Sequence, residues 1–260
     1  MYTYRLTIAY DGTRYRGWQR QQNTEQTVQG TVEACLSQIL GRRMQISGSG
    51  RTDSGVHASG QEASLLLEKR IDAGELLRKL NAALPEDIRI RRVREMPAGF
   101  HARKSALAKC YEYHVDLREK QDVFTRKYSF HFPKQVDVEA MRQAAEKLTG
   151  THDFAGFTDL KEHDDTVRTI YAIQIAQEGE ELVLAYYGDG FLYHMVRILT
   201  GTLLDVGTGR TRPEQIRAIL AAKDRAWTGF PAPAKGLFLR QVYYDREELP
   251  AEIRQKGREE

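Results

Sequence analysis

Apolar and polar positions along the first part of the chain predict strands and helices in turn. Residues 3–10, TYRLTIAY, alternate with the period of two that is typical of a strand. Residues 27–40 repeat apolar side chains at helical spacing behind Thr27, a good N-cap. Their apolar face holds Val28, Val32, Leu36 and Leu40. The sequence therefore opens with a strand followed by an amphipathic helix.

The same patterns complete a repeating unit over the next residues. Short strands are predicted at 42–48, 62–67 and 88–96. A helix is predicted at 72–84, because Asp72 and Glu75 resemble a capping box and Pro85 follows the end. The resulting order, β-α-β-β-α-β, is the ferredoxin-like plan.

The second half of the sequence predicts a similar plan. Its expected elements are a strand at 110–117, a helix at 137–150, a hairpin at 168–189 that turns at 178–181, helices at 191–207 and 211–224, and a last strand at 237–244. We expect an α+β fold of two tandem ferredoxin-like, or RRM-like, domains, with antiparallel sheets joined into one curved sheet and helices on one face.

The expected domain boundary lies in the segment GFHARKSALAK, residues 99–109. Residues 1–104 form the expected N-terminal domain, which carries a glycine-rich loop with an aspartate, and 105–247 form the C-terminal domain. Residues 248–260 are expected to be a charged, loosely held tail.

Composition narrows the class of protein. Hydrophobic residues make up 41% and charged residues 29% of the chain, with no apolar run long enough to cross a bilayer. The opening strand pattern predicts no signal peptide, and two cysteines, Cys35 and Cys110, are too few for a disulfide framework. We therefore expect a cytoplasmic protein.

Charge is divided unevenly along the chain. Residues 1–110 carry 18 Lys and Arg against 11 Asp and Glu, a net +7, whereas residues 111–260 carry 21 against 25, a net −4. The basic half is compatible with contacts to nucleic-acid phosphates and equally with ordinary solvated surfaces.

The segment GSGRTDSGVHASGQ, residues 48–61, places Arg51 and Asp53 among four glycines. Glycine permits backbone shapes that let a loop approach a ligand closely. Asp-Ser-Gly is also common turn chemistry, in which the carboxylate binds nearby backbone amides. The sequence contains no His-x-x-x-His, Cys-x-x-Cys, GxxxxGK[ST] or GxSxG spacing, so a metal hydrolase, a phosphate loop and a serine acyltransferase are all unsupported. An aspartate acting as nucleophile or base is the chemistry that remains.

Several blocks together resemble one family. GRTDSGVHASGQ is similar to the signature loop of the tRNA pseudouridine synthase A family, and the resemblance continues over residues 10–244. The further blocks are YDGTRYRGWQRQ, TVQGTVEACL, FHARKSALAKCYEYHV, TVRTI, GDGFLYHMVRILTGTLLDVGTGR and PAKGLFLRQVYY. The resemblance implies an isomerase that converts uridine to pseudouridine at positions 38, 39 and 40 of the tRNA anticodon arm, acts as a homodimer and needs no cofactor or essential metal.

The resemblance also implies roles for individual residues. Asp53 would be the catalytic residue, Tyr111 would stack on the target base, Arg197 would pair with the catalytic carboxylate, and Leu237 would line the pocket. From the residues alone, core positions explain Tyr111 and Leu237 better than a site role does. Arg197 is explained as a half-buried arginine with some anionic partner, and Arg51 as a phosphate contact or a brace for the loop.

Two departures from the family pattern leave questions open. Ser54 stands where an alanine is expected, and residues 156–168 are unfamiliar, with an acidic EHDD run at 162–165. Trp18 could be a hydrophobic anchor or part of an RNA surface. The rival hypotheses are a non-catalytic RNA-binding module, against which no RNP1-like run is present, and a metabolic enzyme that binds a small anion.

Overall fold

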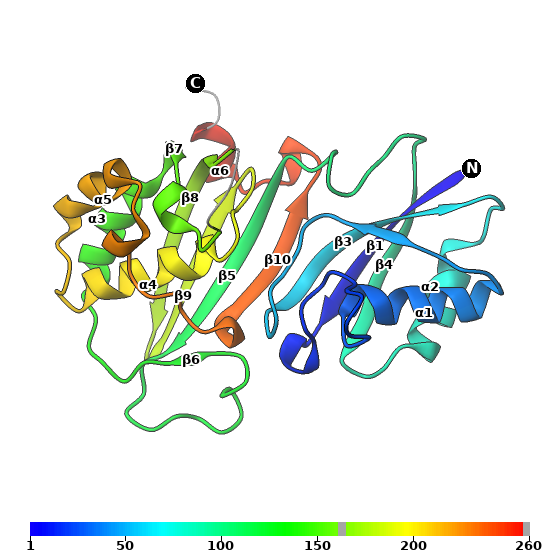
Figure 1. The fold of residues 1–260 in the computed structure, drawn as a ribbon, viewed down its shortest axis with the longest axis horizontal. Coiled ribbons are helices and arrows are strands. Elements are labelled where there is room, and N and C mark those ends of the chain that lie inside the picture. The colour runs from blue at the N-terminus through cyan, green and yellow to red at the C-terminus, as the bar shows by residue number, and fades with distance from the viewer. Residues whose placement is uncertain (161–164, 257–260) are drawn as a thin grey trace. The chain divides into compact units, whose positions relative to one another are not determined.

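The computed structural model describes residues 1–160 and 165–256 and divides the chain into two compact units (Figure 1). Unit 1 comprises Met1–Leu107 and Phe238–Tyr244, and unit 2 comprises Ala108–Leu237 and the residues from Asp245 onward. The boundary between the units, at 107/108, lies three residues after the boundary expected at 104/105. The last strand, which the sequence grouped with the second domain, is grouped with unit 1.

Unit 1 is built on five strands. These are β1 (Tyr2–Tyr10), β2 (Ile46–Gly48), β3 (His57–Leu67), β4 (Ile88–Met96) and β10 (Leu237–Tyr243). Strand β1 lies between β3 and β4, and β2 also pairs with β3, all in antiparallel fashion. Strand β10 is instead parallel to β3, with Phe238 opposite His57. The expectation of purely antiparallel sheets is therefore wrong for this strand.

The helices of unit 1 begin where the sequence predicts. Helix α1 (Val28–Leu40) starts after Thr27, whose hydroxyl accepts a hydrogen bond from the Gly30 amide at 3.3 Å. Helix α2 (Ala73–Ala83) starts after Asp72, whose carboxylate accepts one from the Glu75 amide at 2.8 Å. The two helices contact each other and lie side by side in Figure 1. Their apolar faces and alternate residues of β1 form the core of this unit.

Unit 2 has a second set of strands and helices (Figure 1). Its strands are β5 (Ala108–Asp116), β6 (Phe130–His131), β7 (Gly150–Asp153), β8 (Val167–Glu178) and β9 (Glu181–Gly188). Its α-helices are α3 (Val138–Leu148), α4 (Met195–Gly207), α5 (Ile216–Ala222) and α6 (Ala251–Lys256). Strands β5, β9, β8 and β7 are neighbours in that order and antiparallel, β6 is parallel to β5, and α3 packs on α4.

Single helical turns connect several of these elements. They are η1 (Gly12–Arg14) in unit 1 and η2 (Ala155–Phe157), η3 (Pro213–Gln215), η4 (Arg225–Trp227), η5 (Ala234–Gly236) and η6 (Arg246–Glu248) in unit 2. The helix predicted at 211–224 is therefore split into η3 and α5.

Two further predictions need correction. Helix α4 begins at Met195 rather than at 191, because the preceding His194 has a left-handed φ of 61° that interrupts helical geometry. Within the tail that was expected to be loose, residues 251–256 form α6, in which Ile253 is only 2% exposed, and residues 257–260 lie outside the described part of the chain. In the described residues, no helix is long and apolar enough to span a membrane.

Candidate active site

The loop between β2 and β3, residues 49–56, carries Asp53 and is held by the backbone of an earlier segment. The Trp18 amide donates to the Thr52 carbonyl at 3.0 Å, and the Gly55 amide donates to the Tyr15 carbonyl at 3.3 Å. The Ser54 hydroxyl donates to the same Tyr15 carbonyl at 3.2 Å. The glycines therefore do not make this loop loose, and Ser54 adds one bond that an alanine could not make.

A close backbone approach explains one glycine of this arrangement. Gly17 has φ of 94°, and a Cβ placed there would lie 2.6 Å from the Thr52 carbonyl oxygen and 3.2 Å from the Asp53 carbonyl carbon. Any larger residue would have to push this part of the loop away. Segment 10–18 thus sets the position of the Asp53 backbone.

Two buried aromatic residues, Tyr10 and Trp18, contact the same loop. The Tyr10 hydroxyl lies 2.8 Å from the Thr52 hydroxyl, and burial raises the pKa of Tyr10. The Tyr10 ring stacks on Trp18 with centroids 5.9 Å apart. Trp18 is 1% exposed, so it is the hydrophobic anchor rather than part of an RNA surface. The sequence left this choice open because a tryptophan in a basic segment suits both environments.

His57, at the start of β3, joins the loop to the turn after β1. Its Nδ1 accepts a hydrogen bond from the Gly12 amide at 3.0 Å, and its ring stacks on Phe238 with centroids 4.7 Å apart. The ring is 1% exposed. Sequence analysis did not single out His57, Gly17 or Tyr10, although all three lie in blocks that resemble the family.

Arg51 and Asp53 lie on the same loop but in different surroundings. Arg51 is exposed, and its side chain makes no hydrogen bond or ion pair within residues 1–160 and 165–256. It therefore does not brace the loop. Asp53 is half-buried, and its backbone carbonyl accepts from the Val56 amide at 3.1 Å.

Unit 2 contains the other three predicted site residues. Arg197, on α4, donates from Nε to the Ala232 carbonyl at 2.7 Å, and the Ala232 amide donates to the Arg197 carbonyl at 3.0 Å. The segment that contains Ala232 packs closely on α4. A Cβ on Gly201, one turn further along α4, would lie 1.8 Å from the Phe230 carbonyl oxygen. The position of the guanidinium group is thereby fixed at both ends of the side chain.

Tyrosines on β5 line the same part of unit 2. Tyr111 is 8% exposed, and its ring meets Phe191 edge-on at 5.3 Å. The Tyr113 hydroxyl donates to the Pro233 carbonyl at 2.7 Å. Burial raises the pKa of Tyr113, and the nearby Arg197 charge lowers it by a smaller amount. Arg197 and Tyr113 therefore both donate to the backbone of the same segment, at Ala232 and Pro233.

Leu237 follows η5 and is 5% exposed. The turn before it packs on β5, since a Cβ on Gly236 would lie 2.8 Å from the Tyr113 ring. The structure thus groups Arg51 with Asp53 in unit 1, and Tyr111, Arg197 and Leu237 within unit 2.

The unfamiliar segment 156–168 has a clear internal role at Asp159. One carboxylate oxygen of Asp159 lies 2.6 Å from His194 Nδ1, and the other accepts from Arg225 Nε at 2.8 Å. Burial would raise the pKa of Asp159, but these two partners outweigh it and lower the pKa. Residues 162–164 of the acidic EHDD run lie outside the described residues, and Asp165 is described.

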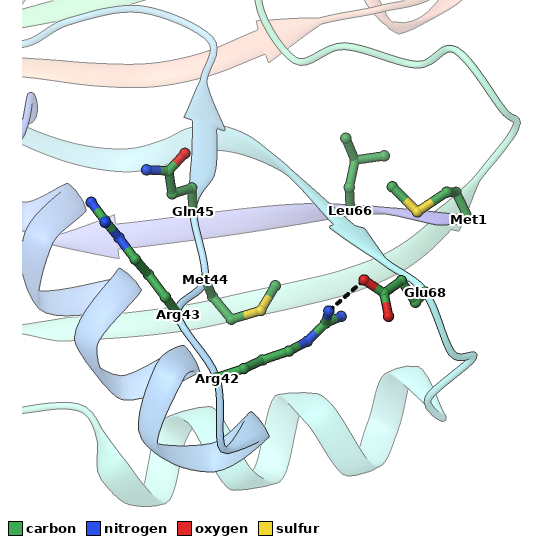
Figure 2. A pocket seen from close by; sticks show the side chains of 7 residues that line it. All are labelled: Met1, Arg42, Arg43, Met44, Gln45, Leu66 and Glu68. Carbon is green, nitrogen blue, oxygen red and sulfur yellow. Dashed lines mark hydrogen bonds and ion pairs between the residues drawn. The ribbon is translucent and has the colours of Figure 1, made fainter.

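Unit 1 also has a surface hollow of about 500 Å³, which other residues line (Figure 2). It is lined by Met1, Arg42, Arg43, Met44, Gln45, Leu66 and Glu68. The Arg42–Glu68 ion pair at 2.7 Å lies along it, and both side chains are exposed. None of the predicted site residues lines this hollow. Within the described ranges, no group of three or more His, Cys, Asp or Glu side chains could hold a metal ion.

Asp53 therefore lies on a glycine-rich loop that backbone contacts with segment 10–18 hold in place. A family model described as tRNA pseudouridine synthase matches residues 6–103 and 144–245. Asp53, Arg197 and Leu237 lie in the matched segments, and Tyr111 lies between them.

Curated relatives agree over nearly the whole chain. The chain is 44% identical over 252 residues to tRNA pseudouridine synthase A 1 of Protochlamydia amoebophila (strain UWE25), covering 95% of this chain and 98% of that protein. It is 46% identical over 243 residues to tRNA pseudouridine synthase A of Anoxybacillus flavithermus (strain DSM 21510 / WK1), covering 93% and 98%. The chain belongs to the tRNA pseudouridine synthase family. It is an isomerase that acts on tRNA, and the alternative of a non-catalytic RNA-binding module is set aside.

Proposed function

We propose that this enzyme converts uridine to pseudouridine at positions 38, 39 and 40 of the tRNA anticodon stem-loop, with Asp53 as the catalytic carboxylate. The observation that carries the proposal is the way in which loop 49–56 is held. Backbone hydrogen bonds and the close approach of Gly17 fix the loop, while the Asp53 side chain stays half-buried. Such positioning is what a catalytic side chain requires.

The reaction needs few chemical groups. The N1–C1′ glycosidic bond breaks, the uracil turns, a C5–C1′ bond forms, C5 loses a proton and N1 gains one, so the atoms balance without a co-reactant. A carboxylate can serve such a reaction as a nucleophile toward the sugar or base, or as a base that removes a proton.

The residues of unit 2 are proposed to support this carboxylate and the base. Arg197 is the proposed charged partner of the catalytic carboxylate, and such a partner favours the ionised form of an acid. Tyr111 is the proposed stacking surface for the extruded base, since stacking on an aromatic ring is worth roughly 1–3 kcal/mol. Leu237 is the proposed apolar wall around the rotating uracil.

Arg51 is proposed to contact an RNA phosphate. It is exposed two residues before Asp53 and has no protein partner among the described residues. Extruding a base from its stack costs on the order of a few kcal/mol, so a cation next to the catalytic residue would help to hold the distorted RNA.

We also infer that each unit derives from a ferredoxin-like repeat. In unit 1 the strands follow the order β4-β1-β3-β2, with α1 and α2 in the two crossovers. Unit 2 repeats the strand–helix–hairpin–helix order with β5, α3, β8, β9 and α4, and places β9 between β5 and β8. The insertions β6 and β7 are additions to that plan.

Tritium release tests the proposed function. tRNA labelled with tritium at uridine C5 releases its label to water when pseudouridine forms. Three transcripts, each with uridine at only one of positions 38, 39 and 40 within the anticodon arm, separate the target positions. We expect release from all three. Release that persists when all three positions lack uridine would show that the anticodon-arm assignment is wrong.

A cytoplasmic homodimer is proposed from the same resemblance. Light scattering on the purified protein measures the oligomeric state directly. A mass twice that of the chain supports the dimer, and a mass equal to that of the 29.8 kDa chain contradicts it.

A further inference from the structure

The segment between β5 and β6, loop 117–129, exposes apolar side chains at its tip. Phe124 is 86% exposed and the adjacent Val123 is 59% exposed. In Figure 1 this segment is the green loop that extends away from the strands of unit 2 near β6. It lies between the two segments that match the family model. A phenylalanine exposed to this extent loses most of the free energy of burial, which is of the order of 1.5–3 kcal/mol for such a side chain.

The first half of the loop is fixed by one buried carboxylate. Asp116, whose side chain is 1% exposed, accepts hydrogen bonds from the Arg118 amide at 3.1 Å and from Arg118 Nε at 2.8 Å. Burial would raise the pKa of Asp116, but the bonds from Arg118 and from the Asp122 amide outweigh it and lower the pKa. The carboxylate therefore stays charged and holds both ends of this turn.

A second carboxylate, that of Asp122, fixes the tip of the loop. One oxygen of Asp122 accepts from the Arg118 guanidinium at 2.9 Å, and the other accepts from the Phe124 amide at 2.8 Å. The backbone of Phe124 is thus tied through Asp122 and Arg118 to the buried Asp116. The phenyl ring is exposed on an ordered turn, rather than on a loose segment.

The returning half of the loop is also tied down. The Tyr128 amide donates to the Thr125 carbonyl at 2.8 Å, and the Ser129 hydroxyl donates to the same carbonyl at 3.1 Å. The Lys235 ammonium donates to the Arg126 carbonyl at 3.0 Å. Both halves therefore hold the tip in one conformation, which lowers the entropy lost when a partner binds.

The exposed charges on the same loop as Phe124 favour one kind of partner. Lys120, Arg126 and Lys127 are exposed, and the exposed acid of this loop is Glu119. Asp116 and Asp122 are occupied by bonds to Arg118 and to loop amides. The exposed charges of loop 117–129 are therefore mostly positive. An aromatic ring among cations matches an unpaired base between phosphates, whereas a protein partner is expected to meet a broader apolar patch.

We propose that loop 117–129 is a second RNA-contact element, in which Phe124 stacks on an unpaired base of the tRNA and Lys120, Arg126 and Lys127 contact phosphates on either side. The proposal rests on the proposed function for its substrate, tRNA. It concerns binding and not the chemical step, so it can fail independently of Asp53.

Phe124→Ala tests the stacking contact. The dissociation constant for tRNA is measured by filter binding, and the single-turnover rate of tritium release is measured at saturating enzyme. We expect Phe124→Ala to weaken tRNA binding about tenfold, because loss of one base–aromatic stack corresponds to roughly 5- to 150-fold. The saturated rate stays within about twofold, because no reacting atom is touched. Phe124→Trp retains wild-type binding.

A matched control removes an exposed aromatic ring elsewhere. Tyr2, which is 37% exposed on β1, is replaced by alanine, and tRNA binding is expected to stay unchanged. Wild-type affinity in Phe124→Ala would overturn the proposal. A shift in the mass of Phe124→Ala by light scattering, with an unchanged affinity for tRNA per protomer, would also overturn the proposal. The loop would then contact another protein chain.

The cations are tested by salt dependence. Replacing Lys120, Arg126 and Lys127 together by alanine should reduce the slope of log K against log salt by about 2, because each single-strand phosphate contact contributes roughly 0.7. An unchanged slope contradicts the phosphate contacts. If the wild type binds tRNA and Phe124→Ala weakens that binding, while no variant or wild type releases tritium, the proposed function fails and this inference stands.

Discussion

Loops 49–56 and 117–129 both connect strands, but they are held in place by different means. Loop 49–56 is fixed by contacts with another segment, 10–18, at distances that leave no room for a side chain at Gly17. Loop 117–129 is fixed mainly by its own neighbours, through the Asp116 and Asp122 carboxylates. The first arrangement tolerates little change in position, as the proposed catalytic role of Asp53 requires, whereas the second holds an exposed side chain in the position proposed for contact with RNA.

The largest effect is expected where segment 10–18 meets loop 49–56, which carries the proposed catalytic residue. Gly17→Ala introduces a Cβ 2.6 Å from the Thr52 carbonyl oxygen at a residue with φ of 94°. We expect the rate of tritium release to fall by at least about 100-fold, because even small misplacement of a catalytic group can cost that much.

Gly41→Ala is the matched control. Gly41 has φ of 66°, but a Cβ there meets no atom within 4 Å. In this variant only the left-handed backbone is strained, which should lower the free energy of unfolding by about 1 kcal/mol. The rate of tritium release should equal that of the wild type. Equal turnover in the two variants would show that the close approach at Gly17 does not position Asp53.

A smaller effect on turnover is expected from the buried hydroxyl pair below the loop. Tyr10→Phe leaves the Thr52 hydroxyl without its partner at 2.8 Å and should cost about 1–2 kcal/mol of unfolding free energy. We expect kcat to fall several-fold with KM nearly unchanged, because the loop and not the RNA surface is affected.

Tyr4→Phe provides the comparison on the same strand. The Tyr4 hydroxyl donates to the Ile71 carbonyl at 2.8 Å and accepts from the Ile71 amide at 3.0 Å, away from loop 49–56. Urea unfolding should show a similar loss of stability, with kcat unaltered. If Tyr4→Phe lowers kcat as much as Tyr10→Phe does, the effect is one of general stability.

The carboxylate that holds loop 117–129 gives a prediction with a pH dependence. Because the pKa of Asp116 is lowered in the folded protein, its contribution to stability is present above the unfolded value of about 3.9 and is lost as pH falls through the folded value. Asp116→Asn should therefore be less stable than wild type at pH 7, and the difference should shrink below about pH 4. Urea midpoints at both pH values measure it, and a difference that is constant with pH contradicts the assignment.

The smallest effect is expected at Ser54. Ser54 is exposed, and its hydroxyl adds one bond to the Tyr15 carbonyl, which also accepts from the Gly55 amide. Ser54→Ala should change turnover by less than about twofold and stability by at most about 1 kcal/mol. A larger loss of turnover would mean that this hydroxyl takes part in the reaction.

Local patterns predicted much of the fold. Thr27 and Asp72 cap the helices that the sequence places after them, and the hairpin of β8 and β9 turns where polar residues interrupt the strand pattern. Strands β6 and β7 escaped prediction because they are two and four residues long, too short for a period to show. The parallel pairing of β10 with β3 depends on residues 181 positions apart, which no local pattern reports.

The candidate site was only partly predictable, because a sequence motif is local whereas the contacts that position it join segments apart in the sequence. The glycine-rich segment around Asp53 is recognisable as a motif, but its rigidity comes from contacts with segment 10–18. The buried position of Trp18 follows from its packing on Tyr10 and not from its basic sequence neighbours. The roles of Asp53, Tyr111, Arg197 and Leu237 stay predictions.

The most direct test of the central claim, catalysis by Asp53, is single-turnover tritium release by Asp53→Asn alongside the wild type. The asparagine keeps the size of the side chain and removes the charge and the nucleophilic oxygen. We expect the variant to bind tRNA with a dissociation constant within about threefold of wild type, or about 0.7 kcal/mol, and to release no tritium above background. Release at a rate near that of the wild type would contradict the account.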